Sequence, residues 1–108
     1  MKRPWMPLYV ADYLHDTRHL TRAQHGSYAL LIMEYWQRGG LPTDEKQLAR
    51  LAGMTEREWK VERSVLAALF EPEWRHKRID AELAKVEDIS GKRRAAVGNR
   101  RDRLTVVK

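Results

Sequence analysis

The chain has 108 residues, of which 43% are hydrophobic and none is cysteine, and its formal net charge is +6. This length allows one domain rather than two, and the hydrophobic content excludes a wholly disordered chain. The missing cysteines exclude a disulfide framework and a thiolate zinc site. No apolar run approaches the roughly 20 residues that span a bilayer, and the charged, proline-broken start is not a signal peptide. We therefore expect a small soluble cytoplasmic protein.

Two prolines interrupt the apolar start of the chain. They favour an extended segment over residues 4–9, and residues 9–14 are expected to follow as a short helix. Several metal-ligand residue types come next, at helical spacing: Asp12, His15, Asp16 and His19. Without cysteine or glutamate in the group, surface and capping roles are the better interpretation. We predict no metal and no cofactor.

A long helix is predicted over residues 22–38. Thr21 and Gln24 have the spacing of a capping box at its start. Its centre, residues 28–36, is apolar almost all round, which is typical of the buried central helix of a core. Gly39 follows and ends the helix, because glycine adopts the left-handed cap conformation without a steric penalty.

Two shorter helices, over residues 44–52 and 56–70, are predicted to form a helix-turn-helix. Thr43 is the expected N-cap of the first helix. The turn falls at residues 53–55, where a glycine allows a tight crossing. Thr55 then begins a capping box for the second helix.

The last predicted elements complete a winged-helix order. Residues 74–79 alternate bulky and charged side chains and predict a short strand, the wing. Residues 80–88 have helical spacing of apolar side chains. The expected fold is thus mainly α: a winged-helix-like domain over residues 1–90, with a basic and flexible tail over 91–108. A small helical bundle is the alternative.

The net charge is located in the tail. Residues 92–108 contain seven basic side chains and one acid, whereas the rest of the chain has equal numbers of both. A basic tail gains affinity for nucleic acid by counterion release. The residues expected to bind DNA combine this tail with the second helix of the helix-turn-helix and the wing: Arg57, Lys60, Arg63, Arg75, Lys77, Arg78, Lys92, Arg93, Arg94, Arg100 and Arg101.

Two hypotheses for function follow. The first is a non-enzymatic DNA-binding or replication-accessory protein. The second is a protein–protein interaction module without direct DNA binding: a homodimer, an adaptor for replication proteins or a helicase loader, or a modulator of a host factor. It follows because the predicted recognition helix carries no net charge and fold does not fix function. Catalysis has no support, since no serine lies in a nucleophile motif and no glycine-rich phosphate loop follows a strand.

Much of the chain resembles a known family. The matching segments are residues 5–9, 12–14, 16–17, 19–21, 25–28, 30–31, 35–36, 48–50, 59 and 74–79. Over about residues 4–87 the sequence is similar to the YdaU-like family of phage and prophage proteins, a domain of unknown function. The resemblance implies a bacterial or phage-infected host cell and a likeness to the winged-helix amino-terminal domains of replisome organisers. It implies no catalytic residues, and longer members continue into a further domain.

Overall fold

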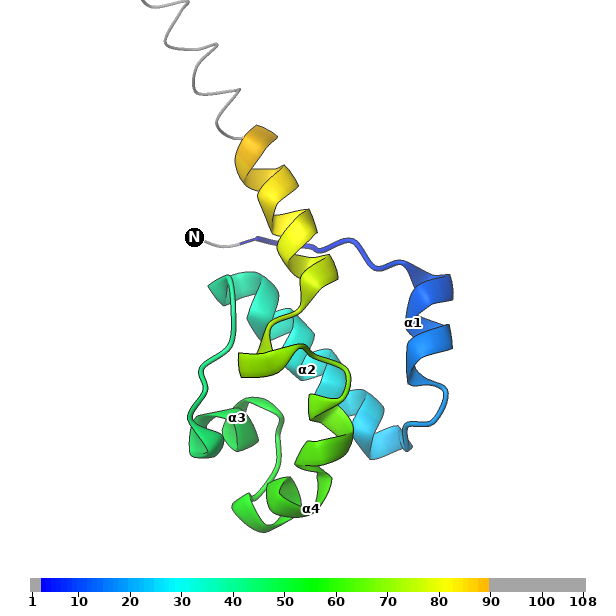
Figure 1. The fold of residues 1–108 in the computed structure, drawn as a ribbon, viewed down its shortest axis with the longest axis vertical. Coiled ribbons are helices and arrows are strands. Elements are labelled where there is room, and N and C mark those ends of the chain that lie inside the picture. Colours follow the sequence, from blue (N-terminus) through cyan, green and yellow to red (C-terminus); the bar gives the residue numbers. More distant parts are fainter. Residues whose placement is uncertain (1–2, 90–108) are drawn as a thin grey trace, which may run out of the picture.

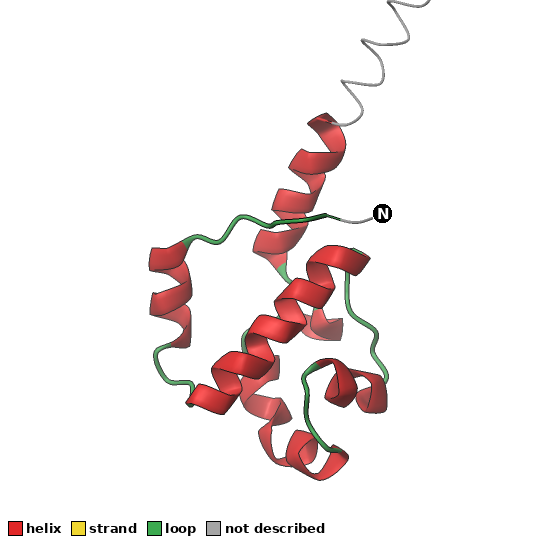
Figure 2. Cartoon of the chain, turned by 180° about the vertical axis from the view of Figure 1, so that it is seen from behind, coloured by secondary structure: helices red, strands yellow, loops and turns green. Residues whose placement is uncertain are grey.

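The computed structural model describes residues 3–89, and Figure 1 shows these residues as an assembly of helices. Seen from behind, in Figure 2, the described chain again consists of helices and loops, without a strand. None of these helices is both long and apolar enough to cross a membrane. The elements are α1 (Val10–Thr17), α2 (Arg22–Arg38), α3 (Glu45–Leu51), α4 (Glu56–Ala67), the 3-10 turn η1 (Pro72–Trp74) and a C-terminal helix described over residues 77–89.

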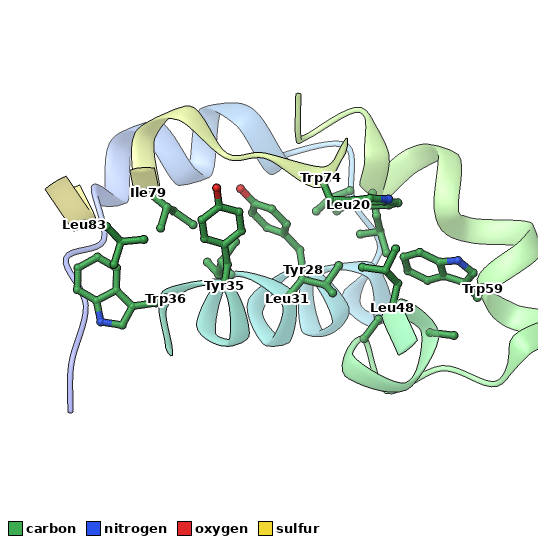
Figure 3. Packing of buried hydrophobic residues seen from close by; sticks show 14 residues of the cluster. Leu20, Tyr28, Leu31, Tyr35, Trp36, Leu48, Trp59, Trp74, Ile79 and Leu83 are labelled. Carbon is green, nitrogen blue, oxygen red and sulfur yellow. The ribbon is translucent and has the colours of Figure 1, made fainter. Parts of the chain in front are cut away.

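Helix α2 lies at the centre of the core, as predicted. Leu31 and Tyr35 are fully buried, and they separate two groups of core side chains (Figure 3). At one end of α2, Trp36 lies beside Ile79 and Leu83 of the C-terminal helix; toward the other end lie Leu48, Trp59 and Trp74. The helix is not buried all round, because Leu30 and Met33 on its outer face are 43% and 49% exposed.

The ends of the helices follow their capping residues closely. Both predicted capping boxes, at the start of α2 and of α4, are present. The C-cap of α2 is Gly39 with φ 81°, as expected. The predicted N-cap of α3 was wrong by one residue: the Asp44 side chain, not that of Thr43, accepts the hydrogen bond from the Gln47 amide. A carboxylate so placed also interacts favourably with the positive end of the helix dipole.

Helices α3 and α4 form the predicted helix-turn-helix. The turn passes through Gly53, whose φ of 73° favours glycine. A Cβ atom here would also lie 3.2 Å from Leu30. The Trp59 indole is buried and donates a hydrogen bond to Glu45 at 3.0 Å, which joins the two helices. The pair is shorter than predicted, because α4 ends at Ala67 rather than at Phe70.

The predicted wing was wrong. Residues 72–74 form a 3-10 turn closed by a single bridge between Glu71 and Arg75, and no strand lies in residues 3–89. The C-terminal helix begins at residue 77, within the segment predicted as a strand. The alternation of side chains has another cause: Trp74 and Ile79 are buried, while His76 provides the cap of a new helix. The fold described is therefore mainly α and lacks a β-wing over these residues.

Residues 3–9, which precede α1 and which we call the strap, are extended and contact α2 and the C-terminal helix. The Arg3 guanidinium donates to the carbonyls of Trp36 and Gln37, at the C-terminal end of α2, where a cation is stabilised by the helix dipole. The strap then passes the C-terminal helix before it reaches α1 (Figure 1). The Tyr9 hydroxyl donates to Glu82 at 2.5 Å, and this bond joins the strap to that helix.

Candidate nucleic-acid interface

The outward face of α4 carries basic side chains without a carboxylate among them. Arg57, Lys60, Val61 and Ser64 have the i, i+3, i+4, i+7 spacing of one helix face, and all four are exposed. Val61 is 73% exposed. Arg57 and Lys60 form no ion pair with any of residues 3–89. We call these four residues the α4 outer face.

The three carboxylates of α4 lie beside this face: Glu56 is four residues before Lys60 and borders it on one side, and Glu58 and Glu62 lie on the other. Glu58 accepts from the Thr55 amide at 2.9 Å, and this backbone hydrogen bond lowers the pKa of its carboxyl. Glu58 and Glu62 border a groove of about 450 Å³ together with Arg57 and Val61 of the same helix, and Ala23 and Ser27 of α2 form its other side. The neutral sum over this helix therefore conceals a basic face beside an acidic flank.

Arg63, predicted as a third DNA contact of this helix, has a structural role. Its guanidinium donates to Glu45 and lies 5.8 Å from the ring centroid of Trp74. Burial opposes ionisation of Glu45, but the hydrogen bonds from Arg63 and Trp59 prevail and lower the pKa of the carboxyl. Arg63 thus fastens α4 to α3 and covers a core tryptophan.

The three cations of the predicted wing border a second concave surface. It has a volume of about 450 Å³ and is enclosed by the end of α1, by Tyr28 of α2, by residues 68–71 and by residues 75–78. Its aromatic wall consists of Tyr28, Phe70 and His76, with Phe70 edge-on to both neighbours at centroid distances of 5.8 and 5.5 Å. We call this surface the basic pocket.

The three cations of the basic pocket differ in their availability. Arg75 donates to Asp80 at 2.8 Å, and its guanidinium lies 5.2 Å from the Tyr35 ring centroid. Arg78 lies 3.7 Å from a carboxylate oxygen of each of Asp12 and Asp16, which is longer than a hydrogen bond. Lys77 is exposed and forms no ion pair within residues 3–89.

His76 organises the junction beneath this pocket. Its Nδ1 accepts from the Ile79 amide at 3.3 Å, so the neutral ring carries its proton on Nε2, 3.0 Å from the Tyr28 hydroxyl. Its own amide donates to the Tyr35 hydroxyl at 3.1 Å. Figure 3 shows both tyrosine hydroxyls pointing from α2 toward the segment that leads into the C-terminal helix. Burial, reinforced by Arg78, lowers the pKa of His76, and burial raises that of Tyr28 to about 12.

The structure thus separates the predicted DNA-binding residues into three groups. Arg57 and Lys60 lie on the α4 outer face, Arg75, Lys77 and Arg78 border the basic pocket, and Arg63 fastens α3 to α4. The five predicted residues of the tail lie outside the described residues: Lys92, Arg93, Arg94, Arg100 and Arg101.

Sequence reasoning missed the carboxylates that face Arg78. The i, i+4 spacing of Asp12 and Asp16 already indicated that both lie on one face of α1. That face contacts residue 78, which is distant in sequence. Over residues 3–89 no group of three or more histidines, aspartates or glutamates is placed to hold a metal ion.

Residues 4–84 match the family described as "Protein of unknown function (DUF1376)", and the chain belongs to this family. It is 42% identical over 96 residues to the "Uncharacterized protein YdaU" of Escherichia coli (strain K12), an alignment that covers 86% of this chain and 33% of that protein. The chain therefore spans about a third of the length of this relative. No solved structure matches. The YdaU-like resemblance is thus confirmed, and neither description assigns an activity.

Proposed function

We propose that this is a non-enzymatic DNA-binding or replication-accessory protein of phage or prophage origin, which acts in the bacterial cytoplasm and presents α4 to duplex DNA. The observation that carries the proposal is the α4 outer face, with two cations that lack an internal partner and no carboxylate between them. In a helix-turn-helix, the second helix enters the major groove with its N-terminal residues toward the bases. Arg57 and Lys60 lie in the first half of α4.

The side chains of the α4 outer face suit the major groove of DNA. An arginine can donate to a guanine edge in bidentate fashion, a small apolar side chain such as Val61 can contact a thymine methyl, and a serine hydroxyl can bond to bases of either kind. Neutralised phosphates supply most of the affinity, and the basic residues 92–108 add to it without sequence preference. The acidic flank formed by Glu58 and Glu62 would have to face away from the duplex.

The test is an affinity measurement with duplex DNA at low salt, using the full chain. R57Q/K60Q should weaken binding by at least about tenfold, since two phosphate or base contacts are lost. R38Q/K85Q is the matched control, because it removes the same charge from two exposed ion pairs, with Glu34 and Glu82, outside the helix-turn-helix. Equal affinities of the two variants, or no binding by the wild type, would exclude α4 as a DNA-reading helix.

A second candidate function, protein–protein interaction, is favoured by the strap and α1. Five large apolar side chains there are exposed, with fractions from 46% to 74%. They are Trp5, Leu8, Tyr9, Val10 and Leu14. Large exposed apolar surfaces are rare on monomeric proteins and often mark interaction sites. Light scattering tests the homodimer directly: a dimer that V10S/L14S converts to a monomer supports it, and a wild-type monomer at all concentrations excludes it.

A further inference from the structure

The basic pocket is a concave site distinct from the α4 outer face. Its volume of about 450 Å³ lies within the range of small-ligand pockets. Four separate parts of the chain contribute to it, and its walls combine three cations and two acidic residues, Asp16 and Glu71, with the rings of Tyr28, Phe70 and His76. Aromatic walls and cations together suit a ligand that has both a flat ring and a negative group.

Lys77 and Arg78 are the cations that a ligand can reach. Arg75 is held by Asp80, by the Tyr35 ring and by close approach to Gly40, so it shapes the wall. Lys77 has no ion-pair partner among residues 3–89, and the side chain of Arg78 is 45% exposed. Lys77 and Arg78 line the same pocket, and arginine and lysine are typical of phosphate recognition, because both donate charge-assisted hydrogen bonds.

Asp12 and Asp16 occupy the position of an anion beside Arg78. Each carboxylate lies 3.7 Å from the same guanidinium nitrogen, and each side chain is at least half exposed. Ion pairs of this geometry are weak, so an entering phosphate can replace them without leaving a charge buried. The two carboxylates therefore compete with the ligand.

We propose that the basic pocket binds a nucleotide through its phosphate, with Lys77 and Arg78 donating to the phosphate and Phe70 contacting the base or sugar. Asp12 and Asp16 pair with Arg78 and compete with the phosphate for it. The phosphate belongs either to a free mononucleotide or to one unit of a single strand. This site does not depend on the α4 outer face, so it can exist whether or not α4 reads duplex DNA.

The experiment is a titration of the full chain, followed by the backbone amide signals of residues 68–78 in NMR spectra. The probes are thymidine 5′-monophosphate, thymidine and a short oligothymidylate. Thymidine 5′-monophosphate should bind, and thymidine should bind at least about tenfold more weakly, because the charge-assisted hydrogen bonds are absent. K77Q and R78Q should each weaken the binding of thymidine 5′-monophosphate by a similar factor. Tighter binding of oligothymidylate, still sensitive to K77Q, identifies a strand as the source of the phosphate.

The competing carboxylates provide the sharpest outcome. D12N/D16N should strengthen nucleotide binding by about two- to fivefold, the equivalent of a released surface ion pair. R38Q/K85Q is the control, because it removes two cations that lie outside both the basic pocket and the α4 outer face, and it should leave nucleotide affinity unchanged. The proposal is overturned if thymidine 5′-monophosphate does not bind at millimolar concentration, if K77Q has no effect, or if D12N/D16N weakens binding. K77Q tests the site without risk to the fold, since Lys77 is exposed and unpaired within residues 3–89.

Discussion

The salt dependence of DNA binding separates the contribution of α4 from that of residues 92–108. A protein that neutralises phosphates releases counterions, and the logarithm of its affinity falls with the logarithm of salt concentration by about 0.9 per phosphate contact. The α4 outer face offers two cations without an internal partner, Arg57 and Lys60. We therefore expect R57Q/K60Q to reduce the magnitude of this slope by about 1.8.

This difference can be measured. Between roughly 50 and 200 mM salt, the affinity of the wild type should fall about tenfold more than that of R57Q/K60Q. Removal of residues 92–108 takes away seven cations and one acid, and it should reduce the slope by up to about 6. Fluorescence anisotropy with a labelled duplex at several salt concentrations gives all three slopes. An unchanged slope for R57Q/K60Q, with a large change on truncation, would refute DNA contact by α4 and assign binding to the tail alone.

Three predictions concern stability. G53A should lower the free energy of unfolding by about 1 kcal/mol or more, because φ at Gly53 is 73° and Leu30 is close. G26A, which has open space around it in α2, should raise the free energy of unfolding by about 0.5–1 kcal/mol. Urea unfolding compares the two variants, and a G53A variant at least as stable as G26A would contradict this reasoning. T55A should cost about 1 kcal/mol through the lost capping box, and an unchanged urea midpoint would argue against it. The pKa of His76 in the folded protein is lowered from 6.5, so its contribution to folding stability is complete above pH 6.5 and is lost as the pH falls through the folded pKa. The thermal unfolding temperature of H76N should lack this pH dependence. A variant that keeps it would show that His76 is not its source.

The helices were predictable wherever a local signal sets them. The capping boxes at Thr21 and Thr55 predicted the starts of α2 and α4, because the side chain that ends the preceding loop also satisfies the first amides of the helix. Gly39 similarly marked the end of α2. The strand over residues 74–79 failed for a tertiary reason. Trp74 packs against Trp59 and Phe70 in the core, φ is positive at both Glu73 and Trp74, and a new helix begins at residue 77.

The candidate sites were predictable in composition and not in arrangement. Residue types alone identified the cations of α4 and of residues 75–78. They could not show that Arg63 and Arg75 are held by Glu45 and Asp80, because ion pairs between separate elements depend on how these elements pack. The helix-turn-helix brought residues 45 and 63 together, 18 positions apart. The packing of α1 beside the start of the C-terminal helix likewise brought Asp12 and Asp16 close to Arg78.

Net charge is a poor guide to binding in this protein, because its cations are of two kinds. Arg63 and Arg75 neutralise carboxylates and cover aromatic rings, so their charge is used within the fold. Arg57, Lys60 and Lys77 have no such partner among residues 3–89 and interact with solvent. Arg78 is intermediate, since its two carboxylate partners can be displaced. A fold whose charges sum to about zero can therefore still present positive charge at particular places, and the arrangement of ion pairs within it decides where that charge is available.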